Sequence, residues 1–179
     1  MKDIKTEKKS DIKWFWTVSI LAFILSIVFS FISSEAVTNL PIVPAIIILL
    51  VVILIGIIFD IIGVAVQVAE EEEFHAMATK KVTSAKTSIN LIRNSSKVAN
   101  FCADVIGDIC GVVSGSIAAA ISMRIMATTN LPFNIQFIVS AIVASLTIGG
   151  KALGKSYADR NSTEIIYRVG KIVRIGKKG

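Results

Sequence analysis

Charged residues are missing from most of this 179-residue sequence, although they make up 18% of it. They are concentrated in short stretches, and the segments between them are long apolar runs without helical or strand spacing. The mean hydropathy is +0.74. These features exclude an ordinary soluble domain.

Residues that support catalysis or a disulfide framework are also few. The only cysteines, Cys102 and Cys110, lie inside one apolar segment, where thiols usually pack as small apolar groups. The single histidine, His75, follows a run of four glutamates, and a lone histidine is more often structural than a metal ligand. The sequence contains no G-x-S-x-G, Walker or H-E-x-x-H pattern. We therefore expect no enzyme activity.

Four apolar segments are long enough to cross a membrane. Because a spanning helix needs about 20 apolar residues, the sequence predicts transmembrane helices near 14–34, 43–69, 98–124 and 132–151. The expected fold class is an all-α membrane protein with four transmembrane helices and amphipathic helices beside the membrane.

The basic residues lie on one side of these four helices. Residues 1–13 contain five lysines, the segment 70–97 contains five basic residues and the tail 151–179 contains eight. Cytoplasmic loops are enriched in Lys and Arg, so we expect a multi-pass cell-membrane protein with both termini in the cytoplasm. The net charge of +6 then indicates membrane anchoring and not nucleic-acid binding.

Two polar segments, 74–94 and 162–175, carry apolar residues at helical spacing between basic residues. Such stripes suit amphipathic helices in the headgroup region, so the lipid bilayer is an expected partner. Ordinary solvated helices that pack on each other are the alternative. Asn161 and Glu164 have the spacing of an N-cap and its capping-box partner, which predicts a helix start after Asn161.

Charges inside the apolar segments are the best candidates for function. A carboxylate at membrane depth costs about 2.5–3.5 kcal/mol, so it normally faces the interior of a helix bundle and finds a partner there. Asp60 lies inside the second apolar segment, on a helix face shared with Gly56 and Gly63. Small residues at these positions allow another backbone to approach closely.

The third apolar segment has a face that is both polar and narrow. Asn100, Asp104 and Asp108 are four residues apart, and a G-x-x-x-G-x-x-x-G pattern from Gly107 to Gly115 lies on almost the same side. Asp108 is expected deeper in the bundle, in a functional or ion-paired role. For Asp104, a tight packing seam or contact with headgroups are the alternatives.

The fourth apolar segment ends in glycines beside lysines. Gly149 and Gly150 can break a helix, and Lys151, Gly154 and Lys155 follow them. Glycines beside a charge at membrane depth favour a discontinuous helix that exposes backbone carbonyls to a cavity. A helix end with two snorkelling lysines is the alternative.

Two short motifs stand at these sites: V-I-G-D ends at Asp108, and G-K-A-L-G-K starts at Gly150. They resemble the I-G-N and G-E-x-x-P-K motifs in the transmembrane domain of the cyclin M / CorC–CorB magnesium transporter family, with Asp108 for Asn and Lys151 for Glu. The segment around Asp60 lies where that family has S-G-S-E-T-A, and the serines of that motif are absent here.

The resemblance covers about residues 43–175. It makes 14–34 an extra helix after a basic N-terminus (1–13) and leaves 176–179 as a basic tail. The family pairs through its membrane helices, which implies a homodimer. Its paired nucleotide-binding (CBS) domains are missing here, so a separate regulatory chain is a candidate partner.

The family is understood to bind a dehydrated Mg²⁺ between its helices, and its ligand positions correspond here to Asp60 (approximately), Asp108 and Lys151. Two carboxylates favour this hard ion, whereas an ammonium group repels it. We therefore predict that Lys151 takes the place of the metal and neutralises Asp60 and Asp108, and that it lies close to Asp108 in the bundle interior. The secondary site candidates are Asn100, Asp104, Gly149, Gly150 and Lys155.

Three functions are left open. The first is a homodimeric cation transporter related to the magnesium family, which the resemblance favours. The second is a non-transporting structural or regulatory membrane subunit in which Lys151 replaces the bound ion, which the charges favour. The third is coupled transport of another ion or of protons through the cluster of Asp60, Asp108 and Lys151.

Overall fold

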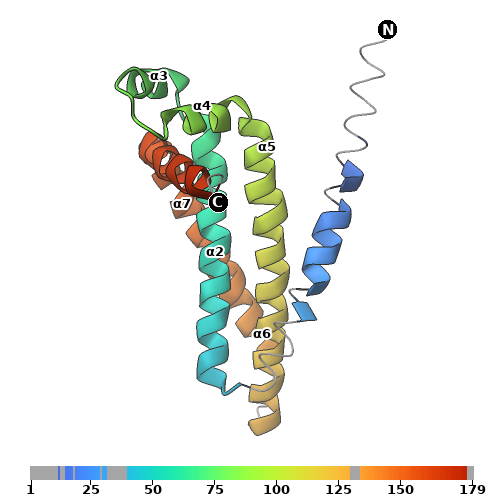
Figure 1. Ribbon diagram of the computed structural model, residues 1–179. Helices are drawn as coiled ribbons and strands as arrows, with labels where there is room; N and C mark the ends of the chain where they lie inside the picture. Colours follow the sequence, from blue (N-terminus) through green and yellow to red (C-terminus); the bar gives the residue numbers. More distant parts are fainter. Residues whose placement is uncertain are drawn as a thin grey trace.

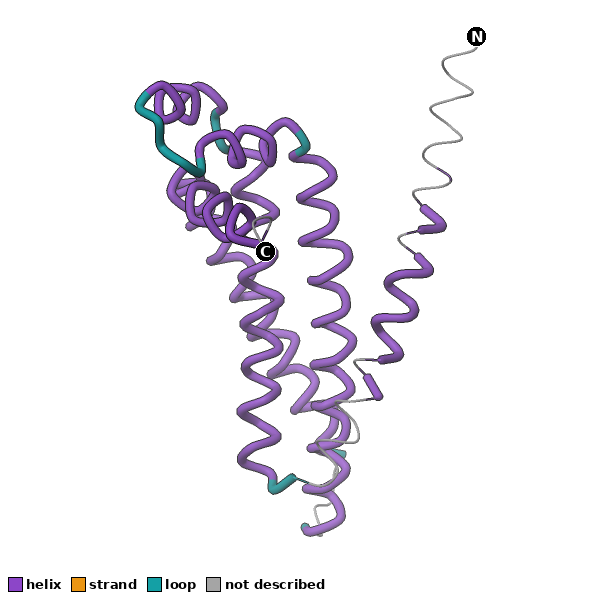
Figure 2. Tube along the Cα trace, in the orientation of Figure 1, coloured by secondary structure: helices purple, strands orange, loops and turns teal. Residues whose placement is uncertain are grey.

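The computed structural model describes residues 12, 15–17, 19–28, 30–31, 40–129 and 134–176. This part of the chain consists of helices with short connecting loops and contains no strand (Figure 2). The predicted all-α class is therefore confirmed.

Three helices are long and apolar enough to span a membrane, and they lie at the second, third and fourth predicted spans. They run along one another in the main body of the molecule (Figure 1). They are α2 (Ile42–Val68), a continuous helical run from Ser95 to Thr128, and α7 (Ile135–Gly176). The middle run comprises α5 (Ser95–Asn100), a π-helical segment η1 (Phe101–Gly107) and α6 (Asp108–Thr128).

The first predicted span, 14–34, lies partly outside the described residues. Its described residues between 15 and 31 are helical, and the apolar helix Phe15–Val28 is shorter than the three spans. Leu25 from this helix packs against the core of the bundle. It borders an apolar cavity of about 250 Å³ together with Val52 of α2 and Val113 of α6.

The segment between α2 and α5 folds into two helices, α3 (Glu71–Thr79) and α4 (Ala85–Arg93), at one end of the bundle (Figure 1). The prediction of one helix over 74–94 is therefore wrong. Lys81, in the turn between them, has a φ of 59°, a left-handed conformation that cannot continue a helix. Three glutamates in the first turn of α3 suit the positive end of its helix dipole.

The helix α7 continues through Gly149 and Gly150, so the predicted break at these glycines is also wrong. Gly150 and Gly154 instead allow α7 to pack closely on α2. A Cβ added to Gly150 would lie 2.3 Å from Ile57 Cδ1, and one on Gly154 would lie 2.7 Å from Ile61 Cγ1. Glycine is needed here because no larger residue allows this approach without a shift of α2 or its side chains.

Asn161 interrupts α7, with φ −127° and ψ 24°, and separates the membrane helix from a tail helix formed by residues 162–176. The predicted helix boundary is confirmed, but the capping box is not formed. The Asn161 amide donates a hydrogen bond back to the Tyr157 carbonyl, and Glu164 pairs with Arg168.

The tail helix packs on α3 and α4, and these three helices together are called the cap. Ser88 Oγ donates a 3.1 Å hydrogen bond to the Ile166 carbonyl, and Thr163 Oγ1 donates a 2.5 Å bond to Glu73 Oε2. Phe74 and Ile166 are fully buried in a second apolar core beneath the cap. Polar contacts therefore hold the three helices of the cap together, and apolar packing joins the cap to α2.

Candidate functional site

Asp60 of α2 and Lys151 of α7 form an ion pair between the membrane helices. Lys151 Nζ lies 3.6 Å from Asp60 Oδ1, and the side chains are 26% and 9% exposed. Asp60 lies eight residues before the end of α2 at Val68, or about 12 Å along the helix axis. The pair is thus inside the apolar span and away from either end of α2.

Glycines on α2 bring the middle helical run against the same site. A Cβ on Gly56 would lie 3.0 Å from Cys110 Cβ, and one on Gly63 would lie 3.3 Å from the Ala99 carbonyl oxygen. The expectation that both glycines allow a close approach is confirmed. The sequence places them four residues before and three after Asp60, so the carboxylate lies in a tightly packed seam.

The π-helical segment η1 forms the third side of the site. A Cβ added to Gly107, its last residue, would lie 3.4 Å from Lys151 Nζ and 3.6 Å from the Cys102 carbonyl oxygen. The lysine ammonium therefore sits directly over the backbone of η1. Single π-helical turns within α-helices occur frequently at functional sites. Sequence reasoning missed this role of Gly107, although the V-I-G-D motif marked the position.

Of the two carboxylates expected to be neutralised by Lys151, Asp60 forms the ion pair, whereas Asp108 forms none with Lys151 among the described residues. Asp108 is exposed and has neither an ion pair nor a hydrogen bond from its side chain within the described residues. The physical reason lies in the preceding residue. The buried Gly107 backbone takes the position next to the ammonium, and the next side chain is left on the outer surface.

The remaining candidates do not join this site. Asn100 and Asp104 are exposed on the outer side of the middle run, and Lys155 is exposed one turn beyond Lys151. A Cβ on Gly149 would meet no atom within 4 Å among the described residues. Gly150 is the exception, because its contact with Ile57 holds α7 close to α2 beside the ion pair.

Asp60 keeps one oxygen without a partner. Its Oδ2 atom is buried and accepts no hydrogen bond from any described residue. The 3.6 Å contact of the other oxygen is also longer than a good hydrogen bond. An unsatisfied buried acceptor costs about 1–3 kcal/mol, so the site has unused capacity to bind a cation or a hydrogen-bond donor.

No group of three or more His, Cys, Asp or Glu side chains suited to a metal ion occurs in the described part of the chain. Of the two predicted metal ligands, Asp60 faces the interior and Asp108 faces outward. The residues present therefore provide one carboxylate and one ammonium group, which is a poor ligand set for Mg²⁺.

A groove of small and polar residues lies beside the site, between α6 and α7, with a volume of about 290 Å³. Gly111 and Gly115 have no described atom within 4 Å of an added Cβ, so this part of the glycine pattern is open. The groove is lined by Gly111, Ser114, Gly115, Ala118, Ser140, Val143, Ala144, Thr147 and Ile148.

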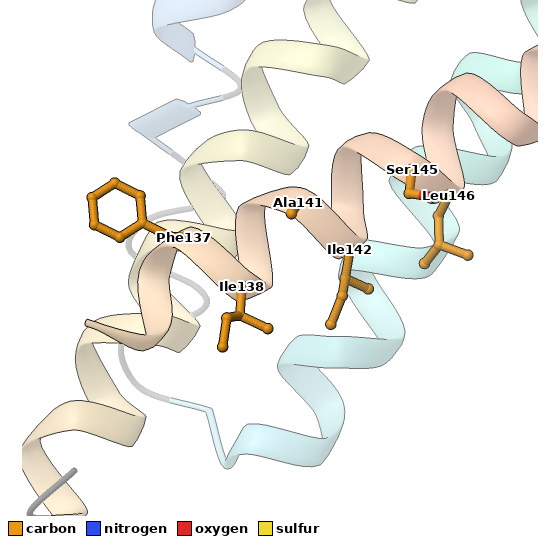
Figure 3. A pocket seen from close by; sticks show the side chains of 6 residues that line it. All are labelled: Phe137, Ile138, Ala141, Ile142, Ser145 and Leu146. Atoms are coloured by element: carbon orange, nitrogen blue, oxygen red, sulfur yellow. The ribbon is translucent and has the colours of Figure 1, made fainter. Parts of the chain in front are cut away.

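A wider hollow of about 550 Å³ lies along the first half of the membrane part of α7 (Figure 3). Ile138, Ile142 and Leu146 point to one side of the helix in this view, and no charged residue lines the hollow. This surface has the character of a lipid-facing helix and offers no chemistry for an ion.

No protein-family model, curated protein or solved structure matches this chain.

The buried pair predicts a specific pattern of stability. Removing one partner leaves an uncompensated charge, which typically costs about 3–5 kcal/mol, whereas neutralising both costs much less. We expect Asp60→Asn and Lys151→Met each to lower the thermal midpoint of the detergent-purified protein more than the double variant does.

The control is Lys155→Met, which removes an exposed lysine one helical turn away and is expected to leave the midpoint nearly unchanged. The substitutions Asp108→Asn and Lys151→Met are expected to have additive effects on the midpoint when they are combined. Additive effects of Asp60→Asn and Lys151→Met would contradict a functional coupling between these two side chains.

Proposed function

We propose that this protein is an ion-transport membrane protein, built like the transmembrane domain of the cyclin M / CorC family, with an ion site altered by Lys151. The observation that carries the proposal is the buried pair of Asp60 and Lys151 between α2 and α7. Ionisable groups inside a membrane bundle usually mark ion pathways.

The order of the elements supports the same proposal. A glycine-bearing membrane helix leads into a charged helix pair, α3 and α4. The V-I-G-D motif follows at the junction of η1 and α6, and the G-K-A-L-G-K motif lies on α7 facing α2. These are the parts, in the same order, on which the resemblance to the magnesium transporter family depends.

Lys151 acts in this proposal as a tethered cation. Opposite charges attract strongly at short range in a medium of low dielectric constant, so the ammonium group stabilises the Asp60 carboxylate without a free ion. An incoming cation must displace the ammonium before it can bind both carboxylate oxygens. Oδ2, which has no partner among the described residues, is the free acceptor oxygen that such a cation would bind.

The charge balance of the pair favours a second candidate. A site that is already neutral needs no metal, which fits a non-transporting structural or regulatory membrane subunit descended from the same scaffold. The two candidates differ in whether Asp60 is ever released from Lys151.

A magnesium titration tests the altered site. We expect added Mg²⁺ to leave the thermal midpoint of the wild-type protein unchanged and to raise that of Lys151→Glu, where two carboxylates face each other. A ligand at 100 times its dissociation constant stabilises a protein by about 2.7 kcal/mol. Lys155→Glu adds the same charge change at an exposed position and is expected to show no such increase.

An increase for the wild-type protein would contradict the role of Lys151 as a tethered cation. Cation flux into proteoliposomes then separates the two candidates. A flux that is lost in Asp60→Asn supports transport, and the absence of flux for any cation tested supports the subunit.

The residues 14–34 are proposed as a fourth span, with both termini in the cytoplasm. The packing of Leu25 against the core between α2 and α6 supports this position. The location of the basic segments before, between and after the spans supports the orientation. The cap then lies on the cytoplasmic side.

Cysteine labelling tests this topology in a background that lacks Cys102 and Cys110. Single cysteines at Glu35 and Thr129 are expected to react with a membrane-impermeant maleimide in intact cells. A cysteine at Lys81, in the turn of the cap, is expected to react only after lysis. Labelling of Glu35→Cys or Thr129→Cys from the cytoplasmic side alone would contradict this topology.

A homodimer is also proposed, through the outer face of α6. Asp104 and Asp108 are exposed within a membrane-spanning helical run, and a carboxylate that faces lipid costs about 2.5–3.5 kcal/mol. The open glycines of the adjoining groove allow a second helix to approach closely. A second copy of the chain at this face removes both carboxylates from lipid.

A leucine at Gly111 is expected to abolish the dimer and to leave the monomer folded, because no described atom lies within 4 Å of an added Cβ. Gly149→Leu makes the same change at an open glycine outside the groove and is expected to remain dimeric. Crosslinking in membranes and mass in mild detergent measure the outcome. A wild-type protein that is monomeric in both measurements would refute the dimer.

A further inference from the structure

A hollow of about 360 Å³ lies in the cap between α3 and α4. Its rim carries nitrogen-bearing side chains, and its floor is apolar. The lining residues are His75 and Ala78 of α3 together with Lys86, Ile89, Asn90 and Arg93 of α4. No acidic residue lines it, although α3 begins with an acidic run.

Two of the neighbouring glutamates, Glu71 and Glu73, are already paired. Glu71 Oε1 accepts hydrogen bonds from Arg93 at 2.8 and 2.7 Å and contacts His75 Nε2 at 2.9 Å. The Arg93 and His75 hydrogen bonds hold the pKa of the Glu71 carboxyl below its usual value. Glu73 accepts the hydrogen bond from Thr163 on the tail helix.

The donors of the hollow are partly fixed and partly unused. Glu71 orients the Arg93 guanidinium, which has further N–H groups to donate. Asn90 Oδ1 accepts from Asn94 at 3.2 Å, which leaves the amide N–H groups of Asn90 without a partner within the described residues. Lys86 is exposed and likewise forms no ion pair or hydrogen bond in this part of the chain.

We propose that this hollow binds a phosphate group. An arginine that is already oriented, a free lysine and an amide donor together match the several oxygen acceptors and the charge of a phosphate. The apolar floor of Ala78 and Ile89 suits the glycerol part of a phospholipid, and the cap lies at the end of the membrane helices, where headgroups are available. The shared chemistry is the phosphate, whether it belongs to a lipid or is free.

This proposal does not rest on the proposed ion transport, because the hollow and the ion pair lie on different elements. The test uses the full chain in a maltoside detergent, which contains no phosphate. The thermal midpoint is measured with added inorganic phosphate, with chloride at the same ionic strength, and with added phosphatidylglycerol. Lys86→Gln and Lys97→Gln are compared, because both lysines are exposed but only Lys86 lines the hollow.

We expect phosphate or phosphatidylglycerol to raise the midpoint of the wild-type protein and of Lys97→Gln. Lys86→Gln is expected to need about tenfold more ligand for the same increase, because it loses one charge-assisted contact. A response to inorganic phosphate identifies a free-phosphate site, and a response to the lipid alone identifies a headgroup site. The absence of any increase, or an equal increase in both variants, would overturn the proposal.

Discussion

A carboxylate inside a membrane bundle is stable only when an opposite charge lies close to it and lipid is kept away. Both conditions require helix backbones to approach more closely than ordinary side chains permit. In this protein Gly56 and Gly63 bring α2 against the middle helical run, and Gly150 and Gly154 bring α7 against α2. The four glycines surround the pair of Asp60 and Lys151, so the packing of all three spans is organised around that one interaction.

The sequence alone predicts those parts of the fold that depend on composition. Long apolar runs predict the three helices that are long enough to span a membrane, and the spacing around Asp60 correctly places it on a face with Gly56 and Gly63. The turn at Lys81 is less predictable, because a lysine with a positive φ carries no sequence signal of its own. The role of Gly150 is ambiguous for a similar reason, since a glycine can break a helix or allow close packing, and only the neighbouring helix decides.

The partner of Lys151 depends on helix rotation, which residue spacing does not determine here. The assignment of Asp108 assumes a regular 100° per residue through the third apolar segment. The π-helical segment η1 has more residues per turn, so each residue after it lies at a different angle from the one that a regular α-helix gives. Gly107 faces inward, and the face that carries Asn100, Asp104 and Asp108 lies on the exposed side of the run. The cluster of Asp60, Asp108 and Lys151 was recognisable in the sequence, but which of the two carboxylates forms the ion pair with Lys151 was not.

The helix α7 carries Lys151 in the membrane and Gly170 in the cap, and a single non-helical residue, Asn161, lies between them. A Cβ on Gly170 would lie only 2.3 Å from Ser88 Oγ, so the tail helix has almost no freedom to slide on α4. Rotation of the membrane part of α7 must therefore either strain this contact or be absorbed at Asn161. How readily the backbone bends at Asn161 thus determines how much of a displacement at Lys151 reaches Gly170, 19 residues further along the chain.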